Sequence, residues 1–294
     1  MNTRYTQIMG GTIAVVGVLA VAWIIWGPSG EGDYPIQRTI RYSFTVKNDS
    51  AHYIQDATFW TYAPVKTTST QRTINLEASH PYTLKTDALG NQQLHFMFKA
   101  LPPYSNKIVR ITAQLALSDE PNDLAVDDRE AFLQPAPYIQ SDAPAMQRLA
   151  KNISKGSDYK TAQAIYTWAA NNIKYSGYIR EDRGALYALK QRKGDCTESM
   201  YLFTALSRAN GIPARGVGGY VVNKSAVLRA EDYHNWAEFY YDSAWWIADP
   251  QKKTFAKRPS RYIAMRIMGV DKSNSQASSH RFAYAGKGLT VLMN

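Results

Sequence analysis

A single cysteine, Cys196, stands in the segment GDCTESMYLFTALSRANGIPARGVGGY, and the chain contains no second cysteine that could pair with it. Asp195 precedes it, where a side-chain cap would begin a helix. A thiol in the first turn of a helix faces unpaired backbone N–H groups and the positive end of the helix dipole, and both stabilise a thiolate. The position therefore predicts a reactive thiol with a lowered pKa. The alternative is a buried, inert cysteine.

Two further side chains could serve this thiol, and both fall in segments with strand character. His234 lies in DYHNWAEFYY, and Asp249 follows in WWIADPQ. Imidazole is the usual base for a thiol, and a carboxylate on its second nitrogen fixes the tautomer. Pro250 biases Asp249 toward extended backbone. Taken singly, His234 could be an ordinary sheet histidine and Asp249 a turn residue. Together with Cys196 they predict a catalytic triad.

The elements that would position these residues are visible in the hydrophobic periodicity. Helical spacing runs through SDYKTAQAIYTWAANNIKY, where Ser157 and Asp158 are candidate caps, through the short GALYALKQRK, and again from Cys196 to Asn210. Gly211 and Pro213 stop the last helix. Three strand-like segments follow, at residues 215–222, 235–241 and 244–248.

Residues 33–118, which precede these elements and contain no cluster of catalytic type, have a different pattern. In TIRYSFTVKN, apolar residues alternate with polar ones, and the same period of two recurs in QLHFMFKAL and VRITAQLAL. This alternation predicts a β-sandwich of six or seven strands over residues 33–118. Residues 119–142 are rich in acidic residues and proline, which indicates a linker or a loop across a domain interface. Residues 143–294 are then the catalytic domain.

The stretch from GDCTESMYLFTALSRANGIPARGVGGY to HNWAEFYYDSAWWIADP resembles the core of the transglutaminase-like superfamily, over about residues 143–257. The resemblance implies an α+β, papain-like fold in which a helix bearing the cysteine packs on an antiparallel sheet bearing His and Asp. It also implies that Cys196 is the nucleophile, His234 the general base and acid, and Asp249 its orienting partner. One departure is His-Asn-Trp in place of the more common His-Ala-Trp, which leaves the triad intact.

The chemistry that follows is attack of Cys196 on an amide or ester carbonyl, giving a thioester that water or an amine resolves. The backbone N–H of Cys196 is one expected oxyanion donor, and Tyr187 or Tyr178 is a candidate for the second. We expect Trp236, Gly219 and Tyr220 to line the substrate cleft. The glycines of RGVGGY lack nucleotide-loop spacing, and no cysteine–histidine pair has metal-ligand spacing, so we expect neither cofactor nor metal.

Residues 8–26, IMGGTIAVVGVLAVAWIIW, form an uncharged, mostly apolar stretch long enough to cross a bilayer. Arg4 before it and acidic residues after it predict a cytoplasmic N-terminus and a single-pass anchor in the inner membrane, with residues 1–32 as stub, anchor and short linker. The catalytic domain would then be periplasmic. A cleaved signal peptide is the alternative, because Ala20-Val21-Ala22 matches a cleavage site.

The net charge of +10 suits anionic envelope surfaces or acidic substrates, and it equally serves solubility. With no nucleic-acid-binding motif, the expected partner is a peptide or protein substrate in the cell envelope. The leading hypothesis is a membrane-anchored thiol protease, amidase or acyltransferase. The competing hypothesis is a non-catalytic envelope scaffold that uses the same fold to present a groove. Hydrolysis and acyl transfer remain open.

Overall fold

The computed structural model describes residues 32–126, 128–269 and 281–294, and Asp33–Asn294 forms one compact unit. The predicted membrane segment, residues 8–26, lies outside the described residues. Among the helices within those described ranges, none combines the length and apolar character needed to span a membrane.

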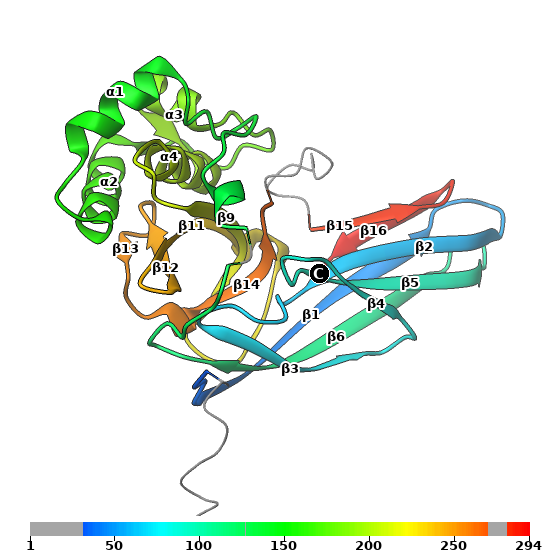
Figure 1. Ribbon diagram of the computed structural model, residues 1–294. Helices are drawn as coiled ribbons and strands as arrows, with labels where there is room; N and C mark the ends of the chain where they lie inside the picture. The colour runs from blue at the N-terminus through cyan, green and yellow to red at the C-terminus, as the bar shows by residue number, and fades with distance from the viewer. Residues whose placement is uncertain (1–31, 127, 270–280) are drawn as a thin grey trace, which may run out of the picture. The chain divides into compact units, whose positions relative to one another are not determined.

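The N-terminal part forms two facing β-sheets that share one core (Figure 1). Six strands come from the region where alternation predicted them: β1 (Ile36–Asn48), β2 (Ile54–Ala63), β3 (Gln71–Ala78), β4 (Thr83–Thr86), β5 (Gln92–Leu101) and β6 (Asn106–Leu117). One sheet is built on β3, β6 and β1, and the other on β2, β5 and β4. Ile40, Tyr42, Phe44 and Val46 of β1 all point into the core, which confirms the predicted apolar face.

The end of the chain completes this sandwich. Strands β15 (Phe282–Ala285) and β16 (Leu289–Met293) pair antiparallel with β2 and β1, respectively. The sequence analysis grouped these residues with the catalytic domain, and the observed pairing instead attaches them to the sandwich sheets. The reason is again period two, because Leu289 and Val291 alternate into the same core as the β1 side chains.

The middle of the chain supplies four helices and a second antiparallel sheet. The helices are α1 (Pro144–Ile153), α2 (Asp158–Asn172), α3 (Ala185–Gln191) and α4 (Cys196–Ala209). The sheet has the order β13-β12-β11-β9-β14 and consists of β9 (Ala214–Val221), β11 (Tyr233–Tyr241), β12 (Ala244–Asp249), β13 (Thr254–Phe255) and β14 (Tyr262–Ile267). The helices gather on one side of this sheet (Figure 1), which gives the α+β arrangement that the resemblance implied.

The helix limits follow from local chemistry. Ser157 caps α2 as predicted, accepting a hydrogen bond from the Lys160 backbone N–H. Helix α3 ends at Gln191, earlier than the sequence suggested, because Arg192 adopts a left-handed conformation with φ of 54°. The next residues form β8 (Lys193–Gly194), which pairs with β7 (Lys174–Tyr175) directly before the cysteine helix.

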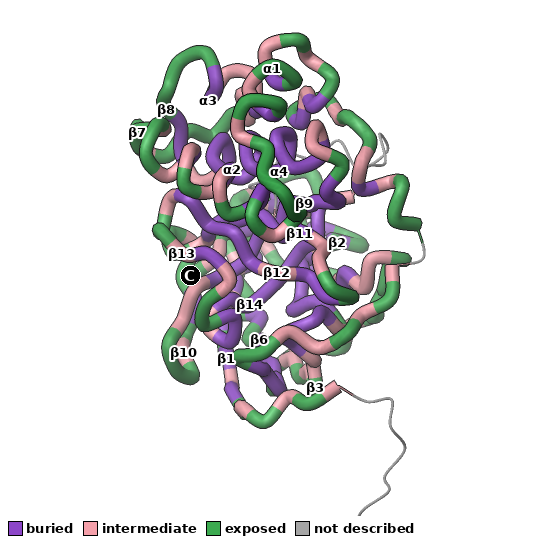
Figure 2. Tube along the Cα trace, turned by 60° about the vertical axis from the view of Figure 1, so that its left-hand side comes forward, coloured by how far each residue is buried: buried purple, intermediate pink, exposed green. Residues whose placement is uncertain are grey.

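Helix α4 is the central element of this half, since it contacts α1, α2, α3 and the sheet. Every residue from Thr197 to Arg208 is buried. Strands β12 and β14 of the sheet are also largely buried, which Figure 2 shows in purple. Arg208 at its C-terminal end donates to the Ala214 carbonyl oxygen at 2.9 Å. The helix start, which carries Cys196, is therefore fixed on a rigid and fully packed support.

The acidic, proline-rich stretch between the two halves lies across both, as predicted for an interface loop. The Asn122 backbone N–H donates to Ser69 O at 2.7 Å, on the sandwich side. The Leu124 N–H donates to Ser243 O at 2.8 Å, in the turn between β11 and β12. These contacts give the stretch a structural role in holding the halves together.

Candidate active site

A capping box begins the cysteine helix and fixes the position of Cys196. Asp195 Oδ1 accepts from the Thr197 N–H at 2.8 Å, and Glu198 Oε2 accepts from the Asp195 N–H at 3.0 Å. The nearly inaccessible Glu198 also forms an ion pair with Arg183 at 2.5 Å. The predicted Asp195 cap is confirmed. Glu198 and Arg183 are additional supports that the sequence analysis missed, although an acidic residue three positions after a cap is a recognisable signal.

His234 and Asp249 form a buried pair at the ends of β11 and β12. The distance from His234 Nε2 to Asp249 Oδ2 is 2.7 Å. The carboxylate also accepts from the Tyr262 hydroxyl at 3.0 Å and, through Oδ1, from the Lys252 backbone N–H at 3.0 Å. A carboxylate can only accept, so Nε2 carries a hydrogen and the free nitrogen of neutral His234 is Nδ1. This is the tautomer that a base toward the thiol requires.

Tyr262 was absent from the sequence-based site. Burial and the neighbouring Asp249 carboxylate both raise the pKa of Tyr262, so its hydroxyl stays neutral and donates. Tyr262 lies on β14, after the basic stretch that follows Asp249, and no spacing rule connects it to the carboxylate. The antiparallel pairing of β14 with β9 brings it there.

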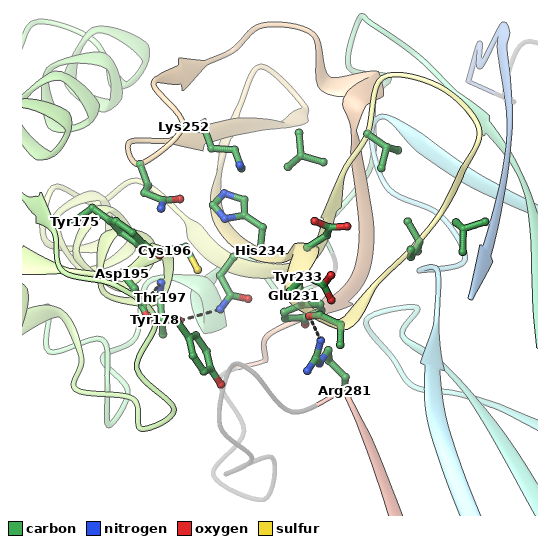
Figure 3. Close-up of a pocket in the computed structure, with 18 residues that line it drawn as sticks. Tyr175, Tyr178, Asp195, Cys196, Thr197, Glu231, Tyr233, His234, Lys252 and Arg281 are labelled. Atoms are coloured by element: carbon green, nitrogen blue, oxygen red, sulfur yellow. Dashed lines mark hydrogen bonds between the residues drawn. The ribbon is translucent and has the colours of Figure 1, made fainter. Parts of the chain in front are cut away.

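The thiol and the imidazole open onto the same groove. Cys196 and His234 both line it, and Figure 3 draws the two side chains among the residues of the groove. Two donors reach the sulfur, namely the Asn235 backbone N–H and the Thr197 hydroxyl. The three predicted triad residues are thus brought into one region of the structure, two of them in the groove and Asp249 behind His234.

The predicted lowering of the thiol pKa is wrong for this arrangement. Burial raises the pKa of Cys196 to about 11, and the negative charges of Asp195 and Asp249 act in the same direction. The hydrogen bonds from Asn235 and Thr197 lower the pKa but do not offset burial. The sequence argument counted the helix N-terminus and had no measure of how deeply the thiol lies. At neutral pH the resting thiol is therefore protonated, and a base must generate the thiolate.

This raised pKa predicts a specific loss of stability in alkali. An unfolded chain ionises its thiol near the ordinary value of 9.0, whereas the folded protein holds it neutral to about pH 11. The contribution is fully present below about pH 9. It is lost between about pH 9 and 11, where the free energy of unfolding falls by about 2–3 kcal/mol. The check is urea unfolding of the wild type and Cys196→Ala across this range. Parallel pH dependences of the two proteins would contradict the prediction.

The groove has a volume of about 780 Å³ and two unlike walls. One wall carries Tyr175 and Tyr178, which Figure 3 shows on the side of the cysteine helix. Both tyrosines are mostly exposed. The opposite wall comes from the segment between β9 and β11, with Val227 and Leu228 among its lining residues. The lining also includes charged side chains, namely Glu231, Asp232, Lys252 and Arg281, so the groove combines aromatic, aliphatic and charged surface.

The second wall is attached to the sandwich. Its short strand β10 (Ala226–Val227) pairs in parallel with β1, and the Leu228 N–H donates to Arg41 O at 2.8 Å. The buried Arg38 of β1 donates to the carbonyl oxygens of Val222 at 3.0 Å and Ser260 at 2.6 Å. The sandwich thus holds one side of the groove in place.

The two tyrosines predicted as oxyanion donors have different positions. Tyr178 lines the groove, and the next residue, Ile179, donates its N–H to Asp195 Oδ2 at 3.0 Å, which holds this loop against the start of α4. Tyr187 does not line the groove. Its hydroxyl accepts from Arg183 Nη1 at 3.2 Å, and its ring lies under the Arg183 guanidinium. The prediction for Tyr187 is therefore corrected, since this side chain supports the loop.

The three residues predicted for the substrate cleft are not among those lining the groove. Trp236 is buried in a cluster with Val217, and Tyr220 points into the sandwich core. A Cβ on Gly219 would lie 2.0 Å from the Ile263 carbonyl oxygen of β14. The sequence suggested that this glycine makes room for substrate. In the structure it instead allows the neighbouring strand β14 to lie close. Tyr220 pairs with Tyr233 and so faces away from His234, whereas Trp236 shares the His234 face but is buried there under other side chains.

In the described part of the chain, no group of three or more His, Cys, Asp and Glu side chains could hold a metal ion.

Comparison with known proteins agrees with this architecture. The model of the transglutaminase-like superfamily core matches residues 147–250, a range that begins in α1 and contains Cys196, His234 and Asp249. This part of the chain is therefore similar to the transglutaminase-like superfamily core.

One relative and one solved structure extend the likeness beyond that core. An uncharacterized protein of Mycobacterium leprae is 30% identical over 186 residues, which cover 59% of this chain and 62% of the relative. The chain thus matches less than two thirds of that relative's length. The crystal structure of a candidate cysteine protease from Cytophaga hutchinsonii superposes with a TM-score of 0.56 at 20% identity, covering 88% of this chain and 92% of that one. This likeness shows a shared fold that includes the sandwich.

Proposed function

We propose that the protein is a thiol enzyme that forms a thioester between Cys196 and the acyl group of a peptide, amide or related ester. The observation that carries the proposal is the 2.7 Å bond between His234 Nε2 and Asp249, which leaves Nδ1 as the basic nitrogen beside the groove. The superfamily core and the cysteine-protease-like fold support the same class of reaction.

The reaction begins with a neutral thiol. As the sulfur attacks the carbonyl carbon, its proton passes to His234 Nδ1, and the charge on the substrate oxygen is stabilised by the Cys196 backbone N–H and the Tyr178 hydroxyl. The tetrahedral intermediate collapses, the C–N bond breaks, and the departing amine takes the proton from Nδ1. Asp249 compensates the imidazolium in between.

The second half regenerates the thiol. Water, or a second amine, gives a proton to Nδ1 as it attacks the thioester carbonyl, and the C–S bond breaks. The thiolate then recovers its proton from the imidazolium. The raised pKa of the thiol, to about 11, makes this last transfer favourable and keeps the resting thiol uncharged.

We also propose that residues 8–26 anchor the protein in the cytoplasmic membrane with the thiol domain outside, acting on envelope peptides or proteins. A non-catalytic scaffold that binds peptides in the groove is the second candidate. The observation in its favour is the raised pKa of the partly buried thiol, which would make it unreactive if His234 did not act as its base.

Acyl-enzyme trapping separates the two functions. We expect p-nitrophenyl acetate at neutral pH to acetylate Cys196, detectable by peptide mass mapping, and we expect Cys196→Ala to release p-nitrophenol only at the background rate of surface groups. Turnover that rises when a primary amine such as cadaverine is added, with the amide as product, indicates a transferase; turnover that the amine does not change indicates a hydrolase. An unmodified Cys196 with background turnover in the wild type would rule out the enzyme and favour the scaffold.

A further inference from the structure

The residues next to the thiol and the imidazole are joined to each other. Thr197 follows Cys196 at the start of α4, and Asn235 follows His234 on β11. Asn235 Nδ2 donates to Thr197 Oγ1 at 2.9 Å, and both residues are buried, with exposed fractions of 3% and 6%. This bond connects the helix and the strand at the level of the reacting groups.

The bond determines what the Thr197 hydroxyl can do. A hydroxyl has one hydrogen to donate and two lone pairs. Because Asn235 Nδ2–H occupies a lone pair, the hydroxyl hydrogen is left to donate elsewhere, and the Thr197 side chain hydrogen-bonds the Cys196 sulfur. Donation to sulfur favours the thiolate over the thiol. The Asn235 backbone N–H donates to the same sulfur, independently of its side chain.

Gly218 on β9 leaves the space that the Asn235 side chain occupies. Asn235 is opposite Gly218 in the pairing of β11 with β9. A Cβ on Gly218 would lie 2.9 Å from Asn235 Oδ1 and 2.1 Å from the Tyr233 hydroxyl oxygen. Any larger residue at 218 would therefore displace the Asn235 amide. Alanine, the residue that more commonly follows the histidine in the family pattern, could not make the bond to Thr197 at all.

We propose that Thr197 and Asn235 form a positioning relay that sets the reactivity of the Cys196 thiol. The Asn235 amide orients the Thr197 hydroxyl, and the hydroxyl stabilises the thiolate as it forms. The inference builds on the proposed function, since it gives that nucleophile an additional means of control. Neither residue exchanges a proton with the substrate.

The test is the pH profile of alkylation of Cys196 by iodoacetamide, which needs no knowledge of the substrate. Thr197→Val keeps the shape of the side chain and removes the hydroxyl. We expect alkylation at neutral pH to slow about tenfold, equivalent to an alkaline displacement of the profile by about one pH unit. Thr197→Ser, which restores the hydroxyl, is expected to return the profile toward that of the wild type.

Asn235→Ala tests the relay itself, because it removes the side-chain amide and keeps the backbone N–H on the sulfur. We expect an alkaline displacement in the same direction, and no further displacement when it is combined with Thr197→Val, since both changes remove one interaction. Thr204→Val is the matched control. Thr204 is also a buried threonine of α4, but its hydroxyl donates to Met200 O, so its replacement should leave the profile unchanged.

Two outcomes would overturn the relay. One is a Thr197→Val profile equal to that of the wild type in a protein whose thermal unfolding shows it to be folded. The other is full additivity of the Thr197→Val and Asn235→Ala displacements. Both are distinguishable from failure of the proposed function, which appears as absent acylation of Cys196 in the wild type, whatever the alkylation profile.

Discussion

Replacing Asp249 with asparagine is expected to lower the rate of Cys196 acylation by about 10³–10⁴-fold, although the side chains have the same shape. The reason is the set of three donors around the carboxylate: His234 Nε2, the Tyr262 hydroxyl and the Lys252 backbone N–H. An asparagine must place its NH₂ group against one side of this set. The backbone donor cannot turn away, so the NH₂ group is driven toward His234 and Tyr262.

The Tyr262 hydroxyl and His234 Nε2 can each accept a hydrogen bond from this NH₂ group. His234 Nε2 can accept only if its hydrogen moves to Nδ1. The imidazole then has no lone pair facing the thiol and cannot act as its base. Nitrogen NMR of His234 reads the tautomer directly, and the acylation rate is measured with p-nitrophenyl acetate. Tyr262→Phe is the companion variant, because it removes one donor and leaves the His234–Asp249 bond. We expect it to cost about tenfold. An Asp249→Asn protein with the wild-type rate would show that the carboxylate does not set the tautomer.

Replacing His234 with alanine is expected to cause a loss of similar size, about 10³–10⁴-fold in the acylation rate at neutral pH. The thiol has a pKa raised to about 11, so without a base almost none of it is ionised at neutral pH. The remaining rate should rise with pH toward that value, because hydroxide replaces the imidazole. The measurement is the acylation rate from neutral to alkaline pH.

The matched control is His52→Ala, which removes an exposed imidazole from the turn between β1 and β2. Its rate should equal that of the wild type at every pH. A His234→Ala protein that retained most of its neutral-pH rate would mean that another group activates the thiol.

Much of this site could be predicted because it is carried by local signals. Asp195 before Cys196 predicts a helix start, and the capping box is there. Strand character around His234 and Asp249, together with Pro250, predicts two rigid positions for an imidazole and a carboxylate, and the two residues meet. The six sandwich strands follow from the alternation of apolar residues, since one face of each sheet must be buried.

The errors have a common physical origin, because each depends on distant packing. Tyr262 reaches Asp249 only through the pairing of β14 with β9. The thiol pKa depends on how deeply α4 is covered, which no helix signal encodes. Tyr220 and Trp236 were expected in the cleft, whereas Tyr220 packs in the sandwich core and Trp236 in the cluster that contains Val217.

The attachment of β10 to β1 has a consequence for any attempt to divide the protein. A fragment limited to the transglutaminase-like core would keep Cys196, His234 and Asp249. The groove wall that contains β10 would, however, lose its pairing with β1 and the hydrogen bond from Arg38 to Val222. If the proposed function holds, we expect such a fragment to be acylated by small reagents and to discriminate less between longer substrates than the full chain does. The sandwich would thus contribute to substrate preference by holding one wall, while the wall with Tyr175 and Tyr178 stays with the core.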